Sequence, residues 1–130
     1  MDIKLARKIA EEAVKESGKI LMDNFNKISK VSFKGERDIV TEIDLKSEKF
    51  ILDLIKSNFP DHTVLSEESG LIKNNEKYIW IVDPIDGTIN YYYGTAPFRV
   101  AVCLLEDRKP IITVIYNPIK DHLYFAEKGK

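Results

Sequence analysis

Two aspartates three positions apart, Asp83 and Asp86, lie in a turn-forming run that reads Asp-Pro-Ile-Asp-Gly-Thr. Pro84 restricts its own φ and biases Asp83 toward an extended backbone, and Gly87 permits a close approach that a side chain would block. Hard cations such as Mg²⁺ prefer carboxylate and carbonyl oxygens, and they need only one or two protein carboxylates when a phosphate completes the coordination. Asp83, Asp86 and the carbonyl of Ile85 therefore form a candidate site for a metal ion and a phosphate.

The segments on either side of this turn are expected to hold it in place. Residues 78–82 read Tyr-Ile-Trp-Ile-Val, a run typical of a buried strand, and we expect that strand to stop at residue 83. A helical turn over 87–90 would direct its free amides toward an anionic phosphate. Taken singly, Asp-Pro and Asp-Gly are more often plain turns, so the interpretation depends on further acidic residues.

Two further acidic segments accompany the turn. Glu67 and Glu68 follow a short extended run at 63–65, although such a pair in a polar loop is usually a solvated surface feature. Thr41 and Asp44 precede a helical pattern, and their spacing equally fits a capping box that only starts the helix. The apolar residues predicted to share one face of that helix are Leu45, Leu52, Ile55 and Phe59.

In order and spacing, the segments at 38–44, 67–69 and 80–91, with the closing run 126–130, resemble the inositol monophosphatase family. That family comprises metal-dependent, lithium-sensitive phosphatases related to fructose-1,6-bisphosphatase. The resemblance implies a Mg²⁺-dependent phosphomonoesterase that hydrolyses inositol monophosphate or a related sugar phosphate, such as fructose-1,6-bisphosphate, with a metal-activated water. No motif marks a nucleophilic serine or cysteine, and we interpret His62 and His122 as structural.

The resemblance also implies a set of metal ligands. Glu67, Asp83 and the Ile85 carbonyl would hold one Mg²⁺, and Asp83 and Asp86 would share in a second, out of two or three ions. In the family a further metal-ligating aspartate comes from a Trp-Asp motif in the second half of the protein. No such motif follows Asp86 here, since the single tryptophan is Trp80.

Catalytic and phosphate-binding roles follow from the same resemblance. Asp44, Glu67 and Thr88 are expected to orient the attacking water. The residues expected to contact the substrate phosphate are Lys34, Asp86, Gly87 and Thr88. For Lys34, a solvated loop lysine is an equally good interpretation.

The length of the chain shows that it contains only part of the family's fold. Family members are about twice as long as these 130 residues, which we expect to form a single domain over 1–130. It would correspond to the N-terminal, metal-binding half of the sugar-phosphatase fold, with the C-terminal half absent. We consider three explanations: a chain cut to its first domain, a split enzyme completed by another chain, or a domain that has lost catalysis and kept binding.

The remaining pattern predicts an α+β domain in which two N-terminal helices pack on a mainly antiparallel sheet. Apolar residues at three- and four-residue steps predict one amphipathic helix over 3–28. Alternation after residue 97 and strand-like runs at 110–116 and 122–126, separated by polar connectors, predict a consecutive antiparallel meander.

The composition and charge of the chain limit the kinds of partner that it is expected to bind. A net charge of −1 with both signs spread along the chain argues against nucleic-acid binding, and the first helix is too polar to span a membrane. The lone Cys103 in an apolar run and the lack of a signal peptide predict a cytoplasmic protein. Expected partners are a small phosphorylated substrate and either a second copy, in a homo-oligomer, or a complementing C-terminal chain.

A hypothesis of another class is a non-catalytic binding module derived from the same fold. Some bacterial relatives serve as partners of the transcription and ribosome-maturation machinery, and a domain that kept only its surface would act in this way. Loss of catalysis would have freed the site residues to drift, whereas Asp44, Glu67, Asp83, Asp86 and Thr88 are all present. The sequence therefore favours the enzyme.

Overall fold

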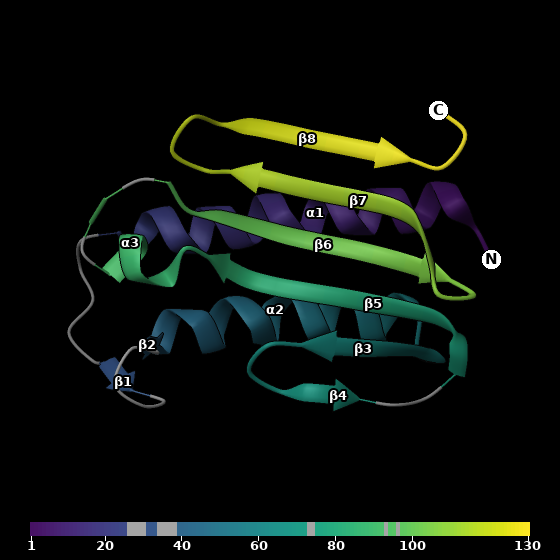
Figure 1. Cartoon of the computed structure of the whole chain (residues 1–130), viewed down its shortest axis with the longest axis horizontal. Helices are drawn as coiled ribbons and strands as arrows, with labels where there is room; N and C mark the ends of the chain where they lie inside the picture. Colours follow the sequence, from purple (N-terminus) through teal and green to yellow (C-terminus); the bar gives the residue numbers. More distant parts are fainter. Residues whose placement is uncertain (26–30, 34–38, 73–74, 93, 96) are drawn as a thin grey trace.

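The computed structural model describes residues 1–25, 31–33, 39–72, 75–92, 94–95 and 97–130, with the backbone alone for 31–33, 39–41, 75 and 88–89. Two long helices, α1 (Ile3–Asp23) and α2 (Glu42–Asn58), cover one face of a six-stranded sheet (Figure 1). Its strands are β3 (His62–Ser66), β4 (Gly70–Ile72), β5 (Asn75–Asp86), β6 (Arg99–Glu106), β7 (Lys109–Asn117) and β8 (His122–Glu127). The predicted α+β class, with helices on a mainly antiparallel sheet, is confirmed.

The strand order across the sheet is β4-β3-β5-β6-β7-β8. Strands β5 to β8 pair antiparallel with their neighbours in sequence, which confirms the predicted meander. Strands β3 and β5 instead run parallel, so their carboxyl ends lie at the same edge of the sheet. Helix α2 begins at that edge, and the short helix α3 (Thr88–Tyr92) follows β5 there, near the two-stranded pair β1 (Val31–Phe33) and β2 (Ile39–Thr41) (Figure 1).

The first helix is shorter than predicted. Asp2 caps its N-terminus by accepting two backbone amide hydrogen bonds of 3.1 Å. The helix ends at Asp23, where the side-chain amide of Asn24 donates to the carbonyl of Ile20 at 2.8 Å. An asparagine that bonds a preceding carbonyl competes with the next turn of helix, and an apolar pattern alone does not reveal this. The last part of the predicted helix, from residue 26, lies outside the described residues.

Packing of α1 on the sheet depends on a small residue. A Cβ added at Gly18 would lie 2.5 Å from a ring carbon of Tyr116, so the glycine lets α1 approach β7 closely. The buried residues of this helix face the sheet and α2, and they are Ala6, Ile9, Ala10, Ala13, Val14, Ser17, Gly18 and Leu21. Mostly small side chains on this face shorten the distance between the helix and its neighbours.

The buried face of α2 is partly polar, which the apolar pattern did not predict. Its buried residues are Ile43, Asp44, Ser47, Glu48, Ile51, Leu52 and Ile55. Leu45 is 52% exposed, so its predicted place on the buried face is wrong. The first two turns of the helix instead bury Asp44, Ser47 and Glu48, and the side chains of Ser47 and Glu48 bond to groups at or just after the carboxyl ends of β5 and β3.

The strand predicted to stop at residue 83 continues to Asp86. Its pairing with β6 is regular from Tyr78 to Asp83, and it resumes at Asp86 after a register shift. Pro84 has no backbone N–H to donate to a neighbouring strand, which accounts for the interruption. The predicted turn is therefore an irregular strand end that pairs with β6 at Asp83 and again at Asp86.

Aromatic residues fill the core at both ends of the sheet. Near the site, the Tyr91 hydroxyl donates to the carbonyl of Leu21 at 2.7 Å, and its ring meets Phe98 edge-on at 4.9 Å. At the other end, the Trp80 indole donates to His62 Nδ1 at 2.9 Å. These contacts fix the sheet against the helices around its most deeply buried side chains.

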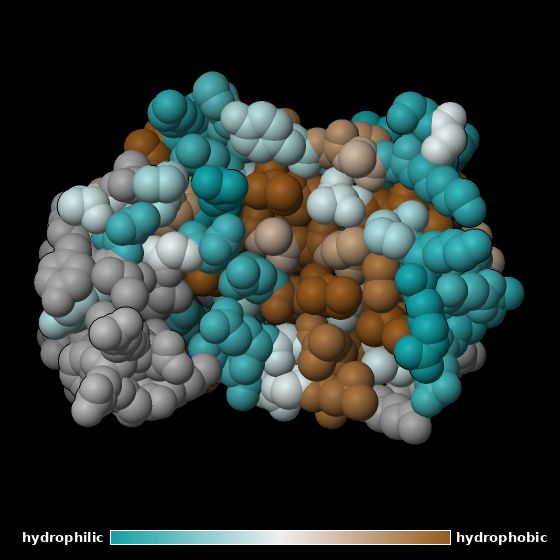
Figure 2. All heavy atoms as spheres, viewed as in Figure 1, coloured by the Kyte–Doolittle hydropathy of each residue, from teal (hydrophilic) through white to brown (hydrophobic). Residues whose placement is uncertain are grey.

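The face of the sheet opposite the helices is open and apolar at its centre (Figure 2). Leu65, Leu71 and Ile81 on this face are 41%, 57% and 39% exposed. None of the helices in the described part of the chain is long and apolar enough to cross a membrane.

Candidate metal and phosphate site

The parallel pair β3 and β5 brings two predicted ligands side by side. The last paired residues of this ladder are Ser66 and Val82, so the next positions along the two strands are Glu67 and Asp83. Neighbouring strands lie about 4.8 Å apart, which places the two residues within reach of one another. The register of the sheet therefore sets their spacing.

Electrostatics shows that three of the predicted carboxylates interact. Burial, the negative charges of Glu67 and Asp86, and a side-chain hydrogen bond with Glu67 raise the pKa of Asp83 from 3.8 to about 6, against a smaller opposing effect of a backbone hydrogen bond at Ile85. A carboxylate resists ionisation when like charges stand close by. Glu67, Asp83 and Asp86 thus form an acidic cluster at the edge of the sheet.

The kinds of donor atom in the cluster suit a divalent cation, while its side chains are not yet arranged around one. Asp83 Oδ1 is buried, and it has no hydrogen-bond partner within the described part of the chain. Such an oxygen is costly to leave without a donor or a cation. No group of three or more histidine, cysteine or acidic side chains among the described residues stands ready to hold a metal ion as placed, and Glu67 and Asp86 are exposed. The donor set of carboxylates and a backbone carbonyl suits Mg²⁺, which would have to draw the mutually repelling side chains inward.

Asp44 lies in the first turn of α2 and is only 2% exposed. Burial first, and then the nearby charge of Asp44, raise the pKa of Tyr91, which is the penultimate residue of α3. Asp44 of α2 therefore lies near enough to Tyr91 of α3 for its charge to act on that hydroxyl. This position agrees with a role at the site, although its place in the first helical turn also fits a cap.

Gly87 makes the turn from β5 into α3 sterically possible. Its φ is +95°, and an added Cβ would lie 2.8 Å from the carbonyl oxygen of Pro97. The predicted helical turn after Asp86 is present as α3, whose first residue is Thr88. The amides of Gly87 and Thr88 thus belong to the start of a short helix beside the acidic cluster.

Comparison with known proteins identifies the family. The pattern of the inositol monophosphatase family matches residues 2–130. The chain belongs to the inositol monophosphatase family. It is 38% identical to the fructose-1,6-bisphosphatase/inositol-1-monophosphatase of Aquifex aeolicus over 130 residues, covering 98% of this chain and 49% of that protein. It is 31% identical to the Nus factor SuhB of Escherichia coli over 125 residues, covering 94% of this chain and 47% of that protein.

Solved structures of inositol monophosphatase family proteins have the same fold. The SuhB protein of Bartonella henselae matches with a TM-score of 0.94 at 34% identity, over 97% of this chain and 50% of that one. The inositol monophosphatase of Thermotoga maritima matches with a TM-score of 0.87 at 32% identity, over 99% and 50%. The chain thus spans about half the length of the relatives that it matches.

Two expected family residues cannot be placed. Lys34 lies outside the described residues, and the side chain of Thr88 does too. Ile85, whose carbonyl is an expected ligand, has its side chain 2% exposed. Of the expected set, the structure therefore brings together Glu67, Asp83 and Asp86, with Asp44 and Gly87 at the same edge.

Two polar residues at this edge were missed by sequence reasoning. Ser47 Oγ donates to the carbonyl of Pro84 at 3.3 Å, and Glu48 Oε1 accepts from the Ser69 amide at 2.8 Å and from the Ser66 hydroxyl. Both residues are buried. Their spacing from Asp44, three and four positions along a helix, was the available signal, because residues so spaced share a helix face.

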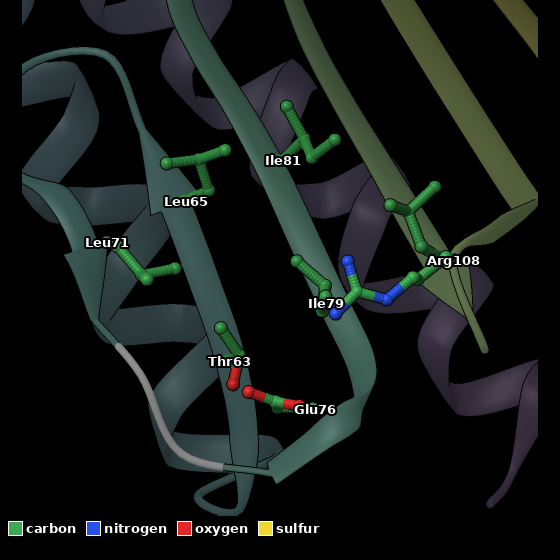
Figure 3. A pocket seen from close by; sticks show the side chains of 8 residues that line it. Thr63, Leu65, Leu71, Glu76, Ile79, Ile81 and Arg108 are labelled. Carbon is green, nitrogen blue, oxygen red and sulfur yellow. The ribbon is translucent and has the colours of Figure 1, made fainter.

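A hollow of about 330 Å³ lies elsewhere, over the middle of the open sheet face (Figure 3). Its lining is mostly apolar, with Leu65, Leu71 and Ile81 on one side and Glu76 and Arg108 at its far end (Figure 3). None of the predicted site residues lines it. The chemistry points to the acidic strand ends, where charged groups converge, and not to this apolar surface.

Proposed function

We propose that this chain supplies the metal-binding half of a Mg²⁺-dependent phosphomonoesterase that acts on inositol monophosphate or a related sugar phosphate. The observation that carries the proposal is the acidic cluster of Glu67, Asp83 and Asp86, with a buried Asp83 oxygen that lacks a donor among the described residues. Membership of the inositol monophosphatase family and relatives named for this activity support it.

Each residue at the sheet edge has a definite task in the proposed reaction. Glu67, Asp83, Asp86 and the Ile85 carbonyl would hold the ions. When bound, Mg²⁺ supplies a lowered pKa of water and neutralises charge on the phosphoryl oxygens. Asp44, with Glu67 and the Thr88 hydroxyl, orients the attacking water toward phosphorus.

The phosphate itself is bound by backbone and basic groups. The amides of Gly87 and Thr88 would donate to its oxygens, and only a glycine fits at residue 87, because its φ is +95° and an added Cβ would lie 2.8 Å from the Pro97 carbonyl oxygen. Lys34 adds a positive charge near the same anion. The chain spans about half of its relatives, so we propose that residues of the other half complete the second metal site and select the substrate.

A second candidate is a non-catalytic binding module that contacts transcription machinery. It is supported by relatives named Nus factor SuhB, at 31% to 34% identity. The presence of Asp44, Glu67, Asp83, Asp86 and Thr88 favours the phosphatase over this candidate, because a domain without catalysis would be free to lose them.

Two measurements on the 130-residue chain test the proposal: Mn²⁺ or Mg²⁺ binding by calorimetry, and phosphate release from inositol-1-phosphate and fructose-1,6-bisphosphate. Asp86→Asn should weaken cation binding at least tenfold, since a carboxylate ligand becomes a neutral amide. Asp61→Asn changes an exposed aspartate and is the matched control. It should bind as the wild type does.

The two measurements separate the candidates. Phosphate release that Asp86→Asn abolishes supports a phosphatase that works without its other half. Cation binding without release supports a half-site that needs completion. If the wild type binds no divalent cation at millimolar concentration, the phosphatase proposal is overturned in favour of the binding module.

A further inference from the structure

One face of α2 holds the backbone of both turns that carry the acidic cluster. Ser47 contacts the turn after Asp83, and its neighbour Glu48 contacts the turn around Glu67. We infer that Ser47 and Glu48 are positioning residues that fix the spacing between Glu67 and Asp83, and with it the affinity of the site for a divalent cation. The inference rests on the proposed function, in which these carboxylates bind metal.

Glu48 holds the Glu67 turn from both ends. Its Oε1 accepts from the hydroxyl of Ser66, immediately before Glu67, and from the amide of Ser69 at 2.8 Å. Two donors that flank a short turn and converge on one oxygen leave the turn little freedom to open. The carboxylate is 1% exposed, and both of its hydrogen bonds go to Oε1, while the buried Oε2 has no partner within the described part of the chain.

Ser47 holds the other turn where the sheet does not. Regular pairing of β5 with β6 stops at Asp83 and resumes at Asp86, and Pro84 has no N–H to offer. The Pro84 carbonyl remains as an anchor, and it accepts the Ser47 hydroxyl at 3.3 Å. A bond to this carbonyl restrains the peptide unit next to both Asp83 and Ile85.

A restraint is needed because the cluster repels itself. Glu67 and Asp83 directly follow the last paired residues of two neighbouring strands, so their like charges lie close together and repel one another. Strand pairing ends at Ser66 and Val82 and does not include Glu67. A rigid helix that holds both turns keeps the backbone of Glu67 and Asp83 at a fixed separation before any cation arrives, so that only their side chains remain to be ordered on binding.

The restraint extends into the body of the protein. Ser47 and Glu48 share a helix face with Asp44, since they lie three and four positions further on. The backbone carbonyl of Ser47 in turn accepts the Ser17 hydroxyl of α1 at 3.5 Å. The position of the site is thereby tied to the packing of both long helices on the sheet.

A merely structural role would make Ser47 and Glu48 ordinary buried polar residues whose loss costs only stability. The experiment therefore compares stability with Mn²⁺ affinity, using calorimetry on the metal-free chain. The variants are Glu48→Met, Glu48→Gln and Ser47→Ala. Ile51→Val is the control, since it removes one methyl group from a fully buried residue of the same helix without touching either turn.

We expect Glu48→Met to weaken Mn²⁺ binding about tenfold or more, as is common when a residue that orients a metal ligand is lost. The Ser69 amide should also exchange its hydrogen faster, because its acceptor is gone. Glu48→Gln keeps an acceptor oxygen and should recover most of the affinity. Ser47→Ala should weaken binding to a smaller extent, and Ile51→Val should lower stability while leaving affinity within about twofold of the wild type.

Separate outcomes would overturn the inference and the proposed function. If Glu48→Met and Ser47→Ala lose stability as Ile51→Val does and bind Mn²⁺ as tightly as the wild type, the inference is wrong and the metal site stands. If the wild type binds no Mn²⁺, the proposed function and the inference fail together. Should Glu48→Met not fold, Glu48→Gln and Ser47→Ala still decide the question.

Discussion

Asp83 is a residue at which stability and the proposed metal binding make opposite demands, because burial and neighbouring charges disfavour the ionised carboxylate that a cation would bind. Its pKa is raised to about 6, first by burial and then by the charges of Glu67 and Asp86. A carboxyl whose pKa is higher in the folded than in the unfolded chain favours folding while it is protonated. That contribution is fully present below pH 4 and is lost as the pH rises through 6.

We therefore predict that Asp83→Asn stabilises the metal-free chain at pH 7. The gain should be about 1 kcal/mol, because the group is half-buried and water screens part of the repulsion. It should shrink toward zero near pH 4, where Asp83 of the wild type is protonated. Urea unfolding in the presence of a chelator, at pH 4 to 7, measures it, with Asp61→Asn as an exposed control. Equal midpoints for Asp83→Asn and the wild type at pH 7 would contradict the prediction.

The residues of the candidate site were only partly accessible from sequence. Carboxylates next to Pro and Gly at a strand end are visible as a local pattern, which singled out Asp83 and Asp86, whereas the expected role of Glu67 came from the resemblance to the family. Ser47 and Glu48 were not found, because a serine and a glutamate on a helix ordinarily face water. Only their contacts with Pro84 and with the residues flanking Glu67 in space show their burial.

Among the elements, the contact between α1 and β7 is the one most sensitive to a single atom. An added Cβ at Gly18 would meet the Tyr116 ring at 2.5 Å, and the Tyr116 hydroxyl is itself held by Asp121 at 2.5 Å. If the Tyr116 ring moved aside for the added Cβ, its hydrogen bond to Asp121 would be broken or weakened. The small residue at this point of the helix sets the distance between the two layers.

Gly18→Ala should destabilise the chain by about 1 to 2 kcal/mol, even though alanine is the better helix former by about 1 kcal/mol. Thermal or urea unfolding measures the loss. In a Tyr116→Ala background only the Pro118 side chain remains close to the added Cβ, at 3.3 Å, so the same substitution should cost much less or become neutral, which a double-mutant cycle tests. A stabilising effect in the wild-type background would show that the ring moves aside without cost.

For helices and strands, the sequence predicts which ones exist better than it predicts the residues at which they end. Apolar periodicity found both helices and the meander, since burial of one face dictates it. The end of α1 depends on a side-chain bond of Asn24, and the extension of β5 past Pro84 depends on pairing with Arg99 across the sheet. Neither interaction produces a periodic pattern of apolar residues in the sequence.

For the molecule as a whole, the dominant feature is a sheet with helices on one face and exposed apolar side chains on the other (Figure 2). Leu71 is 57% exposed there, and Leu65 and Ile81 are 41% and 39% exposed. Exposed apolar patches of this kind promote association in water. The open face is therefore the surface through which isolated chains are expected to meet.

Purified chain should self-associate at high micromolar concentration, and Leu71→Lys should shift it toward monomer. The reason is that a charge on the open face must be desolvated when two such faces meet. Leu45→Lys is the matched control, because Leu45 is 52% exposed on α2, on the helical side. Sedimentation over a dilution series measures the effect. Equal association of the two variants would place the contact elsewhere.

The parallel pairing of β3 with β5 sets Glu67 beside Asp83. The effect of these two charges on the stability of the folded chain therefore depends on whether the buffer contains a divalent cation. Without a cation they oppose folding; with one bound, as proposed, they would stabilise the folded chain by about 2.7 kcal/mol at a hundredfold excess over Kd. The same Asp83→Asn chain would then rank as more stable than the wild type in chelator and as less stable in magnesium. A screen for stabilising variants run without divalent ions would select against the very residues that the proposed reaction needs.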